Sequence, residues 1–307
     1  MSGYSLDTNT QNSKVVHISS VDATTILQTD STSYFSFVLG ENFVCPSNQS
    51  MLISLHSASI PYSFYNIRDE INNKIPYTCN DVDGVITIPA GNYNSSTLAK
   101  KLASLLSAVQ SMNGTLEVEY DRSLMKYKYT LSNGASDPQP DALTLRFTAN
   151  LNTAYIELGF ILGQDVVITG SGVYSSNVAD VNGNIHGLYI RTNLSLDGSY
   201  DSVTKGISTI LGRIPITKNY GGVLFWDPSN GSQHKIQIQT NYIHTITIRM
   251  TDSRNRLIDL NGLNFEVAIQ FDFVYNKVHT PVPIPLRYQN KSKKISPKKV
   301  EDNNVLR

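Results

Sequence analysis

The sequence has few charged residues. Lys, Arg, Asp and Glu make up 16% of its 307 residues, whereas about a quarter is usual in globular proteins. Hydrophobic residues reach only 40%, and no apolar run approaches the roughly 20 residues of a membrane-spanning helix. Ser, Thr, Asn, Gln and Tyr take the place of charge. This composition is common in β-rich proteins that have broad buried contacts, and the length allows a sizeable core.

Cysteine is also scarce. Cys45 and Cys79 are the two cysteines of the chain, too few for a disulfide framework, so we expect two buried thiols in a reducing compartment. The first residues, "MSGYSLDTNTQNSKVV", lack the apolar core of a signal peptide. We therefore expect a soluble protein made inside the cell, in which sequons such as "NQS" and "NGS" are chance products.

Motifs of catalysis and metal binding are also missing. The chain has no G-x-S-x-G elbow, and its six histidines form no H-E-x-x-H or H-x-H pair. Neither cysteine lies in a recognisable Cys-His context. No lysine follows the glycine pairs of "GSGV" and "NYGGV" at phosphate-loop spacing. The sequence therefore predicts no enzyme, no cofactor and no metal site.

What the chain does have is β-strand alternation. Polar and apolar residues alternate in the runs 234–240 and 242–251, which predicts strands with one buried and one wetter face. Eight such runs are separated by Gly, Asn, Asp and Pro turns: 14–20, 33–39, 50–60, 187–194, 207–217, 234–240, 242–251 and 264–275. They predict a mainly β protein, a single eight-stranded jelly-roll sandwich of two four-stranded sheets.

Residues 63–186 have a different pattern, which predicts a small inserted α+β domain between the third and fourth sandwich strands. Short strand-like runs surround "SSTLAKKLASLLSAVQ", whose leucines fall on one stripe of an amphipathic helix. Ser95 or Ser96 is the expected N-cap, because a hydroxyl accepts from the free amides of the first turn. "LNTAYIELGF" is expected to form a short helix or turn. The sandwich would then comprise residues 1–62 and 187–286.

An aromatic cluster follows the third strand. In "LHSASIPYSFYNI", Leu55, Ser57 and Ser59 alternate with His56, Ala58 and Ile60 until Pro61 ends the pairing. Three aromatic residues follow, and we expect them to fill the seam between sandwich and insertion: Tyr62, Phe64 and Tyr65. An aromatic corner within a single core is the alternative interpretation.

The last 21 residues, 287–307, carry seven basic and two acidic side chains, a net charge of +5. The stretch "HTPVPIPLRY" (279–288) leads into them, and its three prolines favour an extended arm. The arm is predicted to contact a partner through five lysines: Lys291, Lys293, Lys294, Lys298 and Lys299. A solvated terminus is the alternative.

Several stretches resemble a known family. "IPYSFYNI", then "TIPAGNYNSSTLAKKLASLL", and later "AYIELGF" and "TIRMTDSRNRLIDLNGLNFEVAIQFDF" are similar, in order and spacing, to penton (vertex) capsid proteins of virophages, Polinton-like viruses and giant-virus relatives. The resemblance covers about a third of the chain. It implies a structural virion protein that forms homopentamers at the five-fold vertices of an icosahedral capsid, beside the major capsid protein, and that is assembled in the host cell cytoplasm.

Other functions remain open at this point. A different minor capsid or spike protein of the same virus type would share the fold but give another oligomer. A jelly-roll carbohydrate-binding module could use the single Trp226 in "LFWDPSNG" as a sugar platform.

Overall fold

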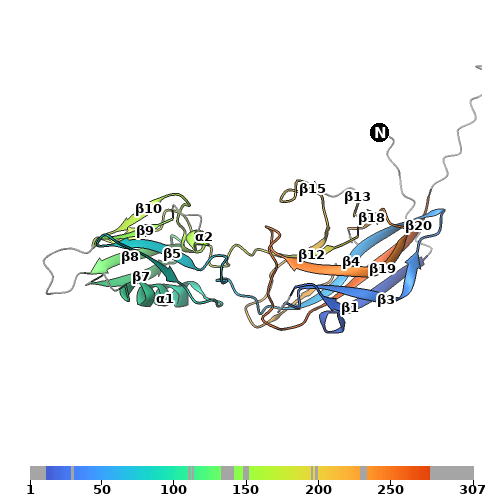
Figure 1. The fold of residues 1–307 in the computed structure, drawn as a ribbon, viewed down its shortest axis with the longest axis horizontal. Coiled ribbons are helices and arrows are strands. Elements are labelled where there is room, and N and C mark those ends of the chain that lie inside the picture. The colour runs from blue at the N-terminus through green and yellow to red at the C-terminus, as the bar shows by residue number, and fades with distance from the viewer. Residues whose placement is uncertain are drawn as a thin grey trace, which may run out of the picture.

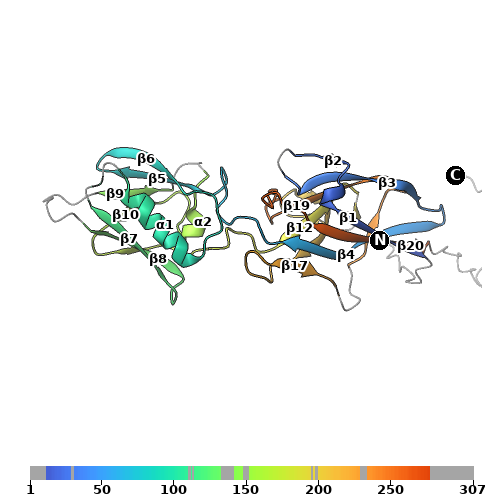
Figure 2. The ribbon, with the colours of Figure 1, turned by 90° about the horizontal axis from the view of Figure 1, so that it is seen from below.

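The structure is a computed structural model that describes residues 12–28, 31–109, 112, 114–132, 142–147, 152–194, 196–197, 200–228 and 234–276. Two β-rich lobes lie end to end along the long axis of the molecule (Figures 1 and 2). We call them the sandwich (residues 12–64 and 185–276) and the small lobe (residues 67–181). Each has its own cluster of buried apolar side chains.

Two antiparallel sheets face each other in the sandwich. The first has the order β1-β20-β4-β18-β13, with β17 paired to the last part of β4. Its strands are β1 (Asn12–Ser19), β20 (Glu266–Tyr275), β4 (Gln49–Pro61), β18 (Ile236–Ile238), β13 (Leu196–Asp197) and β17 (Val223–Trp226). The second has the order β16-β12-β19-β3-β2. Its strands are β16 (Ile210–Ile214), β12 (Leu188–Thr192), β19 (Tyr242–Thr251), β3 (Tyr34–Val44) and β2 (Thr25–Ile26). The chain is thus mainly β, in antiparallel sheets packed as a sandwich.

Strand β4 contains a β-bulge, which corrects the simple alternation expected from its sequence. Leu55 faces the core, and the register with β20 then shifts between Ala268 and Ile269. The extra residue is His56, because Ser57 pairs with Ala268 and Leu55 with Ile269. Beyond the bulge the even-numbered Ala58 and Ile60 face the core. One inserted residue exchanges the two faces of a strand.

The small lobe contains two further sheets and a helix. One sheet has the order β10-β9-β5-β6 and the other β11-β8-β7. These strands are β5 (Lys74–Cys79), β6 (Val82–Thr87), β7 (Thr115–Asp121), β8 (Lys126–Ser132), β9 (Leu143–Arg146), β10 (Asp165–Ile168) and β11 (Val173–Tyr174). The helix α1 (Ser95–Ser107) buries Leu98, Leu102 and Leu106 on the predicted stripe and packs beside β7. "LNTAYIELGF" contains the single-turn helix α2 (Tyr155–Leu158).

The cap of α1 differs from the prediction by one residue. Asn94, not Ser95 or Ser96, is the N-cap: its Oδ1 accepts from the Thr97 amide at 2.8 Å, and the Thr97 hydroxyl accepts from the Asn94 amide at 2.9 Å. The two residues satisfy each other's free amides. Ser95 is therefore the first residue inside the helix.

The remaining elements are small. A two-stranded ribbon joins β14 (Tyr200–Asp201) to β15 (Gly206–Ile207), and η1 (Ser20–Asp22) is a 3-10 turn. Cys45 and Cys79 are both buried and form no disulfide. Within the described ranges, no helix is long and apolar enough to cross a membrane.

Candidate functional site

Asn66 holds together the segments that join the two lobes. Its Nδ2 donates to the carbonyl oxygens of Tyr93 and Val181, both at 2.6 Å. Its Oδ1 accepts from the amides of Ile67 and Tyr93, both at 2.9 Å. The outgoing chain, the Gly-Asn-Tyr loop and the returning chain thus meet at one buried amide. Because every polar atom of that amide is used, the contact is specific.

The three aromatic residues named from the sequence have different environments. Phe64 is buried in the sandwich core, and Tyr62 stacks on it with 4.4 Å between ring centroids. Tyr220 meets Tyr62 edge-on, with centroids 5.7 Å apart. Tyr65 instead lines a separate cavity of about 230 Å³, together with Arg68. The structure therefore brings Tyr62 and Phe64 together and places Tyr65 against another part of the junction.

A charged group joins the lobes beside these rings. Asp252, at the end of β19, is fully buried and accepts from Arg68 Nη2 at 3.3 Å and from Arg256 Nε at 2.7 Å. It also accepts from the backbone amides of Arg254 and Arg256. Burial and the neighbouring Arg256 lower the pKa of Arg68, and Asp252 opposes that shift. Arg68 Nε and Nη1 are buried and lack a hydrogen-bond partner within the described part of the chain.

Glu157 of α2 lies behind this group. Asn72 Nδ2 donates to Glu157 Oε1 at 2.7 Å, while Asn72 Oδ1 accepts from the Arg68 amide at 2.7 Å. Burial raises the pKa of Glu157 to about 7; the Asn72 hydrogen bond opposes this shift and Asp180 adds to it. A carboxyl group that titrates near neutrality is therefore linked through Asn72 to the lobe junction.

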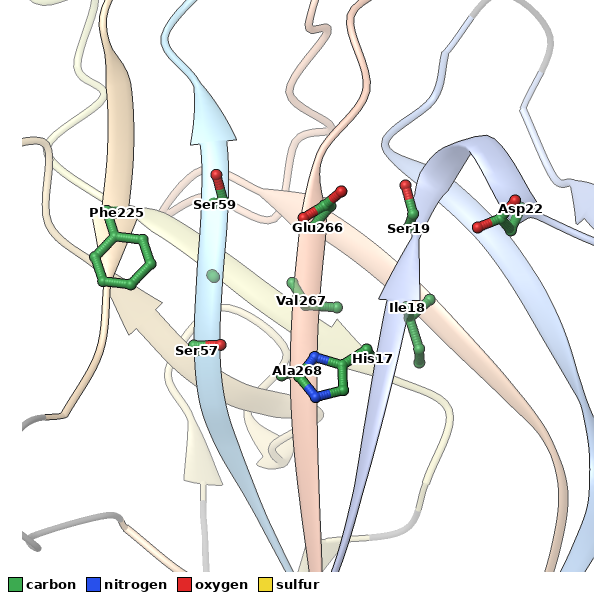
Figure 3. A pocket seen from close by; sticks show the side chains of 11 residues that line it. His17, Ile18, Ser19, Asp22, Ser57, Ser59, Phe225, Glu266, Val267 and Ala268 are labelled. Carbon is green, nitrogen blue, oxygen red and sulfur yellow. The ribbon is translucent and has the colours of Figure 1, made fainter.

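A shallow groove of about 280 Å³ lies on the outer face of the first sandwich sheet. Its side chains come from β17, β4, β20 and β1, which lie side by side in the sheet (Figure 3), and from Asp22 of the 3-10 turn η1 (Ser20–Asp22). Two rows of register partners line it: Ser57, Ala268 and His17 form one row, and Ser59, Glu266 and Ser19 form the next. Among the described residues no hydrogen bond joins these serines to His17.

Trp226 of β17 is partly buried against the sandwich core rather than standing free as a sugar platform. The described residues include no group of three or more His, Cys, Asp or Glu that could hold a metal ion. The five lysines of the basic arm lie outside the described residues.

No protein-family model matches the chain, and no curated protein matches it. Among solved structures, the chain is similar to the crystal structure of the mavirus penton protein. The TM-score is 0.46 at 10% sequence identity, over 86% of this chain and 100% of that one.

Sequence reasoning missed the charged group and Asn66. The segment "TDSRNR" contains Asp252 with two arginines close behind it, which is a signal for a carboxylate bonded to its own turn. Arg68, however, is 184 residues away in the chain, and nothing in the sequence pairs the two.

Proposed function

We propose that the chain is a structural capsid protein, the penton that forms the five-fold vertices of an icosahedral virion, and that its sandwich is a jelly roll. The observation that carries the proposal is the nested pairing of strands. β1 pairs with β20, β3 with β19, β4 with β17 and β18, and β12 with β16. The first strand thus pairs with the last and each inner strand with its counterpart, which is the pairing of a jelly roll, a fold common in viral capsids.

The position of the small lobe supports the same function. The chain leaves the sandwich after β4 and returns before β12, so the small lobe is an insertion between the third and fourth strands of the proposed jelly roll. The stretches that resemble penton proteins meet where the lobes join. Asn66 of "IPYSFYNI" is bonded to Tyr93 of "AGNYN", and Asp252 of "TIRMTDSRNR" to Arg68. Two of these motifs therefore bond to each other, and a third bonds to Arg68, directly after the first motif, so that both contacts tie the insertion to the sandwich.

The mass of the particle in solution tests the proposal. Light scattering on the purified full chain should give about 170 kDa for a pentamer of 34.0 kDa subunits. Five copies would close a ring through heterologous side-to-side contacts. A stable trimer would favour the alternative, another minor capsid or spike protein of the same virus type. A subunit that stays monomeric at high concentration would contradict a preformed penton.

The basic arm is proposed to act on the inner side of the shell of the virion. Its net charge of +5 opposes a net −5 on the rest of the chain, so it would be attracted to acidic surfaces of neighbouring copies and of the major capsid protein. Packaged DNA is the second partner, with contacts that weaken strongly as salt rises. Truncation after Leu286 should leave free oligomers intact and reduce their incorporation into shells assembled in the host cytoplasm. Equal vertex occupancy with and without the arm would show that it is a solvated terminus.

A further inference from the structure

A cleft of about 700 Å³ opens between the two lobes. Three loops and a linker form its walls: the linker after β4, the Gly-Asn-Tyr loop with the start of α1, the returning chain at residues 181–182, and the loop 216–220 after β16. Asn66 is one of the lining residues, and its side chain bonds the linker to the Gly-Asn-Tyr loop and to the returning chain. That amide therefore joins three of the four segments, and the chain after the loop 216–220 is bonded to the linker through the backbone of Tyr62, Gly221 and Gly222.

One wall of the cleft is aromatic. Tyr220 is 47% exposed, and its ring packs edge-on against the ring of Tyr62. Tyr62 in turn stacks on the buried Phe64. Tyr93 also lines the cleft, and its hydroxyl donates to the Pro89 carbonyl at 2.9 Å, which fixes the ring. Rings held by such contacts offer apolar surface at a small cost in conformational entropy.

The rim of the cleft carries polar side chains that bond to none of the described residues. The side chains of Asn182, Lys218 and Asn219 line the cleft, are exposed, and make no hydrogen bond or ion pair with any described residue. A carboxamide presents a donor and an acceptor side by side. That pair matches two neighbouring hydroxyl groups on a sugar ring, since each hydroxyl both donates and accepts. Lys218 is the one charged side chain among the described lining residues.

We propose that this cleft binds a short acidic saccharide. The apolar face of one sugar ring packs on Tyr220, Asn182 and Asn219 bond its hydroxyls, and Lys218 pairs with a carboxylate or sulfate. A peptide fits the site less well. The walls present loops and the start of a helix rather than a strand edge for backbone pairing, and the lining mixes amides with phenols rather than forming an apolar anchor pocket. The inference concerns the cleft of a single subunit and does not depend on capsid assembly.

Titration of the purified full chain tests the inference with three probes: 3′-sialyllactose, a heparin-derived tetrasaccharide, and neutral lactose. Binding is followed by saturation-transfer NMR and calorimetry. Sialyllactose carries a carboxylate and the heparin tetrasaccharide carries sulfates, so comparing the two shows which anion Lys218 prefers. Tyr220→Ala should weaken binding of the favoured acidic probe about tenfold, the effect of losing one well-placed ring contact, whereas Tyr220→Phe should bind as the parent does. Lys218→Gln should lose most of the preference for the acidic probe over lactose.

Tyr200→Ala is the matched control, because Tyr200 is also an exposed tyrosine (82%) but lies on the β14–β15 ribbon and does not line the cleft. It should bind all probes as the parent does. The inference is overturned if no acidic probe binds, if lactose binds as well as both acidic probes, or if Tyr220→Ala and Tyr200→Ala have the same effect. Competition by extended peptides at lower concentration than the saccharides would also overturn it. Since all measurements use single subunits or free oligomers, failure here leaves the proposed capsid role untouched.

Discussion

Gly183 packs directly against the backbone of Asn66, and the carbonyl oxygen of Asn66 occupies the space that a Cβ on Gly183 would need. Gly183 also has a φ of +64°, in the left-handed region. The outgoing and returning chains thus cross at a point where only glycine fits. Gly183 is therefore required for two independent reasons: its positive φ, and the lack of space for a side chain.

Gly183→Ala should destabilise the protein by about 2–4 kcal/mol, because the left-handed conformation and the displacement of Asn66 both add to the cost. Thermal or urea unfolding measures the loss. Gly163→Ala is the control: Gly163 has a φ of +87° but nothing within 4 Å of the added Cβ, so only the conformational cost of about 1–2 kcal/mol remains. Equal losses in the two variants would show that the close approach to Asn66 contributes nothing.

The buried charges at the junction give a second prediction. Asp252→Ala leaves Arg68 buried without its counter-ion, which should cost about 3–5 kcal/mol. The double variant Arg68→Met with Asp252→Leu removes both charges and should recover part of that loss. Urea unfolding of the parent and the two variants measures the loss and the recovery. In contrast, Asp83→Ala removes an exposed partner of Arg146 and should leave the melting temperature unchanged. A small loss in Asp252→Ala would mean that Arg68 reaches solvent when its partner is removed.

Much of this fold could be predicted from the sequence, because the signals concerned are local. Strict alternation marked the strand at 242–251, and the leucine stripe marked α1, since period and burial are properties of short segments. The bulge at His56 and the strand β17 were missed. A bulge depends on the partner strand, and "VLFW" is a four-residue run that forms a strand only because β4 lies beside it. Trp226 lies on this strand. The sequence alone allows an exposed sugar platform, whereas in the structure the strand pairs with β4 and Trp226 packs partly buried against the sandwich core.

Less of the junction could be predicted. The aromatic cluster was visible as a set, but the sequence could not show that Phe64 belongs to the sandwich core and Tyr65 to a separate cavity. Asn66 looked like any other asparagine of an Asn-rich chain. Its role depends on backbone groups of Tyr93 and Val181, and contacts over such sequence distances leave no periodic pattern.

Glu157 gives a prediction about pH. Its folded pKa of about 7 lies above the ordinary value of 4.5, so between these values the folded protein holds a proton that the unfolded chain has lost. The contribution of Glu157 to stability is therefore fully present below about pH 4.5 and falls as the pH rises toward 7. The full change is on the order of 3 kcal/mol. Glu157→Gln keeps an acceptor for Asn72 and should be the more stable protein at pH 8. Urea unfolding at pH 5, 6, 7 and 8 measures the difference, and identical pH profiles for the two proteins would contradict the raised pKa.

Removal of the small lobe tests where the sandwich ends. The sequence places the boundary at Tyr62 and Gly187, but Phe64 and Ile185 are buried in the sandwich core. Ser63 is also tied to it, because its hydroxyl donates to the Leu260 carbonyl at 2.7 Å and its own carbonyl accepts from Asn261 at 2.6 Å. The chain ends to be joined lie close together, as the bond from Asn66 to Val181 requires.

A short Gly-Ser linker from Tyr65 to Asn184 should therefore give a soluble, all-β protein with a cooperative unfolding transition. Joining Tyr62 to Gly187 deletes two core side chains, and the loss of Phe64 alone should cost about 3–5 kcal/mol. Far-ultraviolet circular dichroism and urea unfolding compare the two variants side by side. If both fold with equal stability, Phe64 and Ile185 fill the seam without supporting the core. If neither folds, the sandwich needs the small lobe, and the two lobes form a single folding unit despite their separate hydrophobic clusters.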